Sequence, residues 1–284
     1  MIKVNGYPIK FETFPEGEFR MNKFKDVFAH NKQDKISIEW FWSGDNSEMM
    51  ELYFVVKHLK KIKGAGTWFA LYMPYVPYGR QDRVEDSVNE IFTLKHFADF
   101  INSLEFDMVQ VLDPHSDVTM ALIDNSTDDK ALIVNIINGL IEDNEYDALF
   151  MPDLGAQKRY SSLLAYPNFS GYKVRDYATG EITGYKILDY KKDYKNILII
   201  DDLCSYGGTF LRAAKELKKK GVSNIDMYVT HCETNIYKGD LLYSGLINQI
   251  YTTNSIMPMQ PIVCKGGQKS VTPIQKCAIS YFEA

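Results

Sequence analysis

The chain has 284 residues, of which 45% are hydrophobic and 24% charged, so it can bury a core and is not a disordered or fibrous protein. Its 32 Lys and Arg residues against 37 Asp and Glu residues give a net charge of −5, without a long basic block to neutralise a nucleic-acid backbone. The longest apolar runs have the length of strands, far below the ~20 residues of a membrane span, and the first residues do not resemble a signal peptide. We therefore expect a globular, cytoplasmic protein that binds neither nucleic acid nor membrane, with either two domains or one large unit with a single continuous core.

Helical and strand patterns alternate along the chain. Apolar residues spaced by three and four over residues 48–63 predict an amphipathic helix, and the apolar run at 68–73 predicts a buried strand. The alternation continues with helices predicted at 94–104, 131–141 and 209–220 and strands predicted at 108–112, 148–151, 196–200 and 225–230. Helices alternating with strands are typical of parallel sheets with helical crossovers, so the predicted fold class is α/β.

Polar residues follow four of the predicted strands. In parallel α/β sheets, ligands bind beyond the carboxyl ends of the strands, so these residues are candidates for a binding site. The four segments are residues 74–83, 113–117, 152–155 and 201–209. Together they carry carboxylates, a histidine, arginines and a glycine-rich turn.

The last of these segments combines an acidic pair with a glycine pair. Asp201 and Asp202 follow the predicted strand, and Gly207 and Gly208 precede the next predicted helix and Thr209. Glycines let the backbone approach a phosphate closely, and the amides at a helix N-terminus favour an anion. A sugar phosphate would fit both halves, with the carboxylates on ribose hydroxyls and the glycine turn on a phosphate. An ordinary helix N-terminus behind acidic residues is the alternative, and the local pattern does not decide between them.

These motifs resemble those of a known family. The run Ile-Leu-Ile-Ile-Asp-Asp is separated by four residues from Gly-Gly-Thr. This pattern is similar to the phosphoribosyl pyrophosphate motif of the type I phosphoribosyltransferase fold. The segment Met-Pro-Tyr-Val-Pro-Tyr-Gly-Arg-Gln-Asp is more specific, because it resembles the ATP-binding stretch of ribose-phosphate pyrophosphokinases, or phosphoribosyl pyrophosphate synthetases. Further segments resemble the family's motifs in the family's order, at 14–18, 113–115, 152–159, 173–175, 230–231 and 252–254.

The resemblance implies an architecture and a reaction. It implies two phosphoribosyltransferase-like domains, each a parallel sheet flanked by helices, with the active site between them. We expect an ATP-binding domain at residues 1–132 and a ribose-phosphate-binding domain at 133–284, whose last strand could return to the first domain. In the family, the β,γ-diphosphoryl group of ATP is transferred to the anomeric hydroxyl of ribose 5-phosphate with Mg²⁺, and AMP is released. Such a transfer depends on positioning and charge neutralisation more than on covalent participation of the protein.

The resemblance also implies roles for single residues. Lys173 and Arg175 match the family's catalytic Lys-x-Arg, and on an extended segment they would point to the same side. His115 would bind the metal of Mg·ATP, and Asp153 a second Mg²⁺ shared with ribose oxygens. The residues expected to bind ATP are Phe14, Glu18, Arg80, Gln81 and His115, and those expected to bind the sugar phosphate are Asp153, Asp201, Asp202, Ser205, Tyr206, Gly207, Gly208 and Thr209.

Two of these implications concern motion and assembly. Residues 176–183 resemble the mobile flap that closes over the reacting phosphates. In the family, Phe14 and Glu18 would reach a neighbouring subunit's adenine site, which implies a homodimer or a higher homo-oligomer. Structural roles remain open as alternatives: a core position for Phe14, a solvated charge for Glu18, and a buried strand-end histidine at His115.

The chain departs from the family pattern at the loop for the 5′-phosphate. Ser205 and Tyr206 stand where the family has Asp and Thr. The change either weakens binding of ribose 5-phosphate, or opens the loop and offers Tyr206 as a stacking face for an acceptor extended beyond its 5′-phosphate. ADP-ribose is such an acceptor, and a divergent branch of the family makes ADP-ribose 1-pyrophosphate for NAD synthesis. The sequence leaves the choice between ribose 5-phosphate and ADP-ribose open.

Two other functions remain as alternatives. A phosphoribosyltransferase would use residues 201–209, but it has no use for Arg80 and Gln81. A non-catalytic, synthetase-associated regulatory subunit would have no need of His115, Asp153, Lys173 and Arg175, which are all present.

Overall fold

The computed structural model describes residues 1–21, 35–64, 66–84, 90–175, 182–256 and 271–273. The chain forms two compact units, Met1–Asp129 and Lys130–Cys277. The boundary expected from the sequence follows residue 132, and the boundary between the units follows Asp129. The expected return of the last strand to the first domain concerns residues outside the described ranges.

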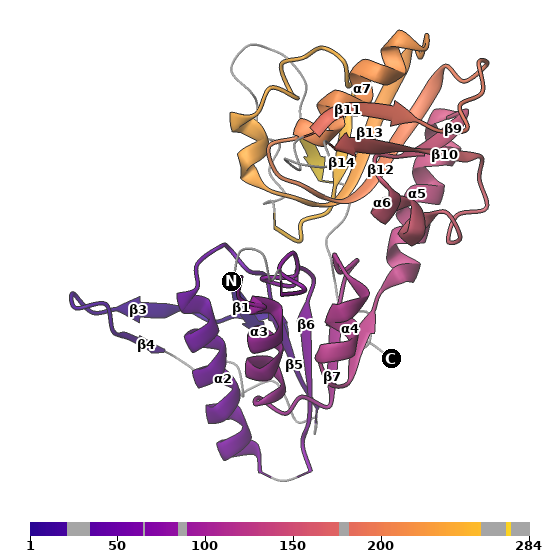
Figure 1. Ribbon diagram of the computed structural model, residues 1–284. Helices are drawn as coiled ribbons and strands as arrows, with labels where there is room; N and C mark the ends of the chain where they lie inside the picture. The colour runs from indigo at the N-terminus through magenta and orange to yellow at the C-terminus, as the bar shows by residue number, and fades with distance from the viewer. Residues whose placement is uncertain (22–34, 65, 85–89, 176–181, 257–270, 274–284) are drawn as a thin grey trace. The chain divides into compact units, whose positions relative to one another are not determined.

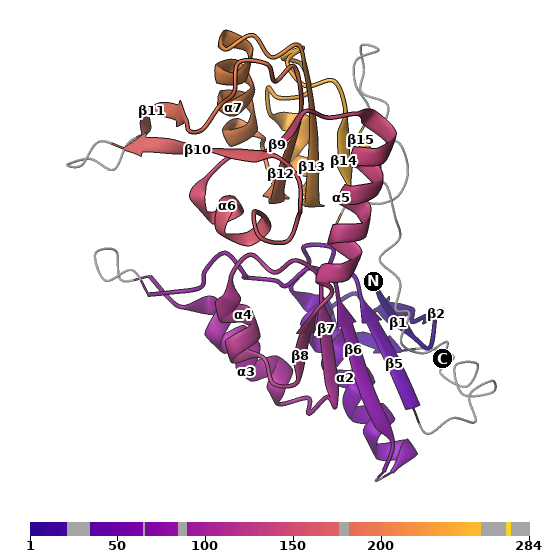
Figure 2. The same cartoon turned by 90° about the vertical axis from the view of Figure 1, so that its right-hand side faces the viewer.

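The first unit is built on a mixed sheet (Figures 1 and 2). Among the described residues its strands lie in the order β2 (Tyr7–Pro8), β1 (Ile2–Val4), β5 (Lys35–Trp40), β6 (Trp68–Met73), β7 (Met108–Val111) and β8 (Ser126–Asp128). Strands β5 to β8 are parallel, whereas β1 is antiparallel to both β2 and β5.

The antiparallel edge adds to the predicted parallel sheet. Asn5 and Gly6 join β1 to β2, and both have positive φ angles, the conformation that an Asn-Gly hairpin turn adopts. A two-residue turn can connect only antiparallel strands. A connection between parallel strands must run back along the length of the sheet, which takes about a dozen residues or more.

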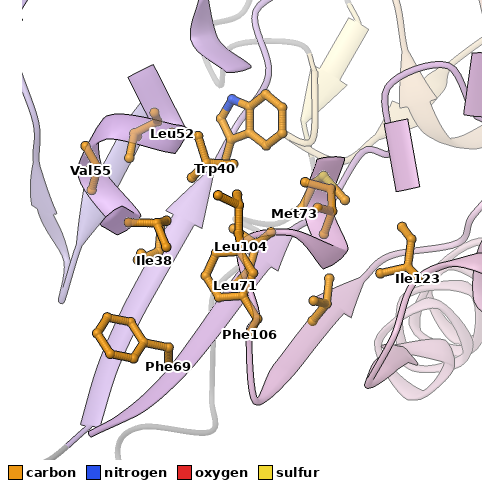
Figure 3. Close-up of a cluster of buried hydrophobic side chains, with 14 of the residues drawn as sticks. Ile38, Trp40, Leu52, Val55, Phe69, Leu71, Met73, Leu104, Phe106 and Ile123 are labelled. Carbon is orange, nitrogen blue, oxygen red and sulfur yellow. The ribbon is translucent and has the colours of Figure 1, made fainter. Parts of the chain in front are cut away.

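Helices α2 (Ser47–Lys63) and α3 (Thr93–Asn102) pack on this sheet through their apolar faces. Figure 3 shows Leu52 and Val55 of α2 beside Ile38 and Trp40 of β5 and Leu71 of β6. Each fully buried side chain of this kind contributes about 1.5–3 kcal/mol to folding. The short helix α4 (Asp117–Leu122) follows β7, and the β3–β4 hairpin (Phe11–Thr13 and Phe19–Met21) stands beside α2 in Figure 1.

The second unit has a larger mixed sheet. Its described strands lie in the order β11 (Ile182–Ile187), β10 (Asn168–Arg175), β9 (Ala148–Met151), β12 (Asn196–Cys204), β13 (Asn224–Cys232), β14 (Ile250–Thr252) and β15 (Val271–Pro273). All neighbouring pairs are parallel except β10 and β11, which form an antiparallel hairpin. The helices of this unit are α5 (Lys130–Asn144), α6 (Leu154–Tyr160), α7 (Gly208–Lys219) and the 3₁₀ helix η1 (Thr234–Lys238).

The predicted elements are confirmed, and two of the strands and helix α5 extend further than predicted. Strands β6 and β9 have the predicted bounds, whereas β12 continues to Cys204 and β13 to Cys232. The apolar run of β12 ends at Ile200, but Asp201 pairs with Val229 of β13, so the sheet ladder carries the acidic residues within the strand. The acidic pair therefore belongs to the sheet and not to the loop that follows it.

Candidate functional site

The acidic pair is buried at the end of the central strand β12. Asp201 and Asp202 are 9% and 4% exposed, and the Asp202 N–H donates to Asp201 Oδ1 at 2.9 Å. Arg159 of α6 forms an ion pair with Asp202, with Nη1 2.7 Å from Oδ1. Burial, followed by the charges of Asp202 and Asp153, raises the pKa of Asp201 well above its ordinary value. Arg159 thus neutralises one of the two carboxyl groups and leaves the other to a proton or a cation.

Asp153 stands at the end of the neighbouring strand β9. It is the N-cap of α6, and its Oδ1 accepts a hydrogen bond from the Ala156 N–H at 3.1 Å. Its second oxygen, Oδ2, lies 3.6 Å from the Lys173 Nζ. The cap fixes the carboxylate in one orientation and turns its other oxygen toward the lysine.

Lys173 lies on the β10–β11 hairpin, which is bonded to the loop of Asp153. The Tyr185 hydroxyl donates to the Pro152 carbonyl oxygen at 2.6 Å. A Cβ on Gly171 would lie 2.2 Å from this hydroxyl, so only glycine allows the Tyr185 ring to cross β10 there. Burial, with the negative charges of Asp153 and Asp201, raises the pKa of Tyr185. Tyr185 was not predicted from the sequence, because no local pattern links it to residues more than thirty positions away.

The expected geometry of Arg175 is only partly described. The pairing of β10 with β11 shifts its register between Val174 and Arg175, which interrupts the simple alternation of side chains along β10. The Arg175 side chain and residues 176–181 of the expected flap lie outside what the structure describes.

The glycine turn between β12 and α7 packs on the segment that follows η1. Gly207 has φ +80°, and a Cβ there would lie 2.7 Å from Leu241 Cδ2. A Cβ on Gly239 would lie 2.0 Å from the Tyr206 carbonyl oxygen, so the two segments touch through both glycines. Helix α7 begins at Gly208, directly before Thr209, so the backbone amides of its first turn lie at the end of this loop.

Ser205 and Tyr206 face different surroundings within that turn. Ser205 Oγ donates to Glu233 Oε2 at 2.5 Å, whereas the Tyr206 side chain is 54% exposed. Glu233 was also missed by sequence reasoning, since it lies beyond the end of a predicted strand in a segment that carries no recognisable motif.

In the first unit, the Arg80–Gln81 segment adjoins His115. A Cβ on Gly79 would lie 3.9 Å from the Cβ of His115, which brings the ends of β6 and β7 together. Arg80, Gln81 and His115 are all exposed. The structure therefore groups the three residues at one edge of the sheet, as expected for neighbouring strand ends.

The turn before His115 directs its side chain outward. Asp113 is buried with φ +45°, and its N–H donates to Asp128 Oδ1 at 3.0 Å. Ser116 then caps α4 by accepting from the Val118 N–H. His115 between them is exposed, which rules out the alternative of a buried strand-end histidine.

Phe14 and Glu18 lie together at the tip of the β3–β4 hairpin. The Phe14 N–H donates to the Glu18 carbonyl oxygen at 2.6 Å, and the Arg20 guanidinium lies 5.3 Å from the centre of the Phe14 ring. Phe14 is 43% exposed, so it is not a core residue. Both side chains are available on the surface of this unit.

The oxygen donors of the second unit fit Mg²⁺ better than the histidine of the first. Mg²⁺ is bound mainly by oxygen atoms, commonly one or two carboxylates together with substrate phosphates and water. Asp153 and Asp201 supply carboxylates whose charges influence each other. Within the described ranges, no group of three or more His, Cys, Asp or Glu side chains is arranged to hold a metal ion, so substrate oxygens would have to complete such a site.

Two further observations bear on the class of protein. In the part of the chain that the structure describes, no helix is both long and apolar enough to cross a membrane. No protein-family model matches the chain. Its two units are α/β proteins with mixed, mostly parallel sheets, and the second unit carries an acidic pair and a glycine turn at the end of a central strand.

Known proteins of one family are similar to most of the chain. The ribose-phosphate pyrophosphokinase of Sulfolobus acidocaldarius is 26% identical over 256 residues, which cover 87% of this chain and 84% of that protein. The corresponding protein of Pasteurella multocida is 25% identical over 252 residues, covering 87% of this chain and 78% of that protein. A crystal structure of phosphoribosylpyrophosphate synthetase from Mycobacterium smegmatis has the same fold, with a TM-score of 0.66 and 19% identity over 94% of this chain and 86% of that one.

The chain is therefore a distant relative of the ribose-phosphate pyrophosphokinase family, with the fold of phosphoribosylpyrophosphate synthetase. The resemblance stated from the motifs is confirmed at the level of family and fold.

Proposed function

We propose that the chain catalyses Mg²⁺-dependent transfer of the β,γ-diphosphoryl group of ATP to the anomeric hydroxyl of a ribose 5-phosphate group, with release of AMP. The observation that carries the proposal is the cluster at the strand ends of the second unit. There Lys173 lies 3.6 Å from Asp153, beside the buried pair of Asp201 and Asp202. The distant similarity to ribose-phosphate pyrophosphokinases supports the reaction class, while the acceptor and the catalytic activity itself are part of the proposal.

The acidic pair would bind the ribose hydroxyls of the acceptor. Carboxylates accept hydrogen bonds from vicinal hydroxyls, and the Arg159 ion pair holds Asp202 in one position. The raised pKa of Asp201 means that its charge is costly unless a cation or a donor compensates it. A bound Mg²⁺ would supply that compensation and withdraw charge from the transferring oxygens, with Asp153 and Asp201 as its carboxylate donors.

Lys173 would stabilise negative charge on the transferring diphosphoryl group. Phosphoryl transfer is accelerated chiefly by positioning and by cations that neutralise developing charge. The capped carboxylate of Asp153 and the Tyr185 contact limit the movement of this lysine and its hairpin. Arg175 would act with it as a second cation, as the family resemblance implies.

ATP would be bound by the exposed residues of the first unit. Arg80 suits the phosphates, because a guanidinium binds phosphate oxygens in a fork, and Gln81 has an amide for the adenine. His115 would lie by the metal of Mg·ATP. Phe14 and Glu18, exposed at a hairpin tip, would serve the adenine site of a neighbouring subunit in a homodimer or a larger homo-oligomer.

An extended acceptor such as ADP-ribose fits the altered loop better than ribose 5-phosphate. The Ser205 hydroxyl already donates to Glu233, so its proton is directed away from a phosphate in the loop. The exposed Tyr206 ring offers a face on which a base or a second ribose could stack. With ADP-ribose the product would be ADP-ribose 1-pyrophosphate, an activated sugar suited to NAD synthesis.

The direct test is release of AMP from ATP and Mg²⁺, with ribose 5-phosphate and ADP-ribose supplied in separate reactions. We expect AMP in both, with the higher kcat/KM for ADP-ribose. Release of pyrophosphate from phosphoribosyl pyrophosphate and a nucleobase, without AMP formation from ATP, would indicate a phosphoribosyltransferase instead. AMP formation in neither reaction by well-folded protein would leave the regulatory-subunit alternative.

A further inference from the structure

A glutamate outside the predicted loop of residues 201–209 contacts the turn between β12 and α7. Glu233 directly follows β13, and its N–H donates to the Cys204 carbonyl oxygen at 2.8 Å. Its Oε2 accepts from Ser205 Oγ at 2.5 Å and from Asn235 Nδ2 at 3.1 Å. Backbone and side chain together hold the carboxylate against the turn between β12 and α7.

The segment that follows Glu233 packs closely on this turn. Gly239 lies against the Tyr206 backbone and Leu241 against Gly207, each closely enough that a Cβ on the glycine would clash. The segment after Glu233 thus contacts the turn at Gly239 and at Leu241. The Glu233 carboxylate therefore stands beside a loop that, by its glycines and helix N-terminus, is otherwise suited to an anion.

The charge of the bound phosphate decides how strongly Glu233 opposes it. A terminal phosphate monoester carries about −1.5 to −2 charges near neutral pH. A phosphate that bears a second substituent has lost one ionisable oxygen and carries about one negative charge. In ADP-ribose the substituent is a second phosphate, which carries a further negative charge. Because Coulomb repulsion falls with distance and this second charge lies further along the acceptor, the carboxylate opposes the monoester more strongly than the substituted phosphate.

We propose that Glu233 is a specificity-determining residue that selects ribose acceptors whose 5′-phosphate carries a further substituent over those with a terminal 5′-phosphate. The inference rests on the proposed function of the loop. It assigns the selection to repulsion of the wrong acceptor, which is a common source of specificity in binding sites. Tyr206 contributes attraction to the extended acceptor, and Glu233 contributes repulsion of the terminal 5′-phosphate of ribose 5-phosphate.

The test is Glu233→Gln, which keeps the size of the side chain and an oxygen that can accept from Ser205, but removes the charge. We expect kcat/KM for ribose 5-phosphate to rise about tenfold, equivalent to about 1.4 kcal/mol. Because only one of the two charges of ADP-ribose lies on the phosphate nearest the turn, the rise for ADP-ribose should be smaller, so the ratio of the two kcat/KM values should narrow. Glu216→Gln is the matched control, because Glu216 lies on α7 with Lys219 as its partner and its loss should leave the ratio unchanged.

Binding measured without ATP separates this inference from the proposed function. Calorimetric dissociation constants for ribose 5-phosphate and ADP-ribose report the same ratio even if no AMP is ever formed. Ser205→Ala, which removes the hydrogen bond but keeps the charge, should retain the preference for ADP-ribose. Equal changes for both acceptors in Glu233→Gln, or loss of binding of both, would overturn the inference and leave Glu233 as a structural part of the loop.

Discussion

The two halves of the segment from Asp201 to Thr209 differ in what holds them. Asp201 and Asp202 are part of the β12 ladder, are buried, and are anchored by Arg159. Ser205 and Tyr206 lie in the turn beyond the strand, where Tyr206 is more than half exposed. The half that would bind ribose matches the family motif, whereas the half that would meet the 5′-phosphate does not. Residues in a strand ladder are constrained by their neighbours on both sides, but a turn can change its chemistry without disturbing the sheet.

The two halves would thus have different roles, the first in the reaction itself and the second in the choice of acceptor. Asp153, Lys173 and the acidic pair would serve any ribose acceptor, because the hydroxyls of the ring are the same in each. The turn and Glu233 would meet only the 5′ side of the acceptor, where ribose 5-phosphate and ADP-ribose differ. Changes in the first group should therefore reduce all activity, and changes in the second should alter preference.

The largest expected effect is that of Lys173→Ala. Loss of this cation should lower kcat about a hundredfold with both acceptors, about 2.7 kcal/mol of barrier, and leave the KM for ATP nearly unchanged. Lys186→Ala is the matched control, since Lys186 is an exposed lysine on the partner strand of the same hairpin. Steady-state kinetics with both acceptors check the result, and near-normal turnover of Lys173→Ala would exclude it from catalysis. Arg175→Ala should have an effect of the same order.

The acidic pair should respond to substitution in opposite directions. Asp202→Asn removes the partner of the Arg159 guanidinium and should lower the free energy of unfolding by about 2 kcal/mol. Asp201→Asn removes a carboxyl group that is costly to ionise and should raise the free energy of unfolding by about 1 kcal/mol. The same substitution should lower the activity.

The gain from Asp201→Asn should depend on pH. Because the folded-state pKa of Asp201 is raised, its ionisation destabilises the fold as pH rises above the ordinary value of about 3.9. The advantage of the Asn variant should thus be absent at lower pH and grow with increasing pH. Denaturant unfolding at several pH values measures it, and equal destabilisation by both variants would contradict the described arrangement.

A smaller effect is expected at the ATP side from His115→Ala. The side chain is exposed, so the melting temperature should be unchanged. The KM for Mg·ATP should rise about tenfold, about 1.4 kcal/mol, if the histidine lies by the metal or its phosphates. A lower melting temperature with unchanged kinetics would assign His115 a structural role.

The smallest effect should come from Tyr206→Ala. Loss of an exposed aromatic face should reduce kcat/KM for ADP-ribose about fivefold, about 1 kcal/mol, and leave that for ribose 5-phosphate unchanged. Tyr243→Ala is a control, because Tyr243 is equally exposed but lies outside the turn. An equal loss with both acceptors would show that Tyr206 shapes the loop and does not contact the extension.

The sequence was sufficient for four helices, for five central strands and for the residues that follow them, because periodicity and motif spacing are local signals. Other strands of the two sheets, such as β5, β10 and β14, were not predicted. The helix predicted at 48–63 and the strand at 68–73 correspond to α2 and β6, and the residues after the strands lie where a parallel sheet puts them. The short helices α4 and α6 were missed, since six and seven residues complete too few turns to show periodicity.

The contacts that join the site could not be predicted in the same way. Tyr185 reaches Pro152, Arg159 reaches Asp202, and Ser205 reaches Glu233 only because the sheet order brings distant strands together. The last contact also bears on substitutions in the turn. Replacing Ser205 by Asp to restore the family residue would set a second carboxylate against Glu233, so that exchange should be combined with Glu233→Gln.

In the proposed reaction, both terminal phosphoryl groups of ATP move together to the anomeric oxygen of a ribose acceptor. Phosphorus NMR of the reaction with ATP, Mg²⁺ and ADP-ribose tests it most directly, because it identifies every phosphorus-containing product. We expect AMP together with a new pyrophosphate ester at C1 of the acceptor, and the same pattern at a lower rate with ribose 5-phosphate. Formation of ADP with a phosphate monoester, or no change in the spectrum with either acceptor, would contradict it.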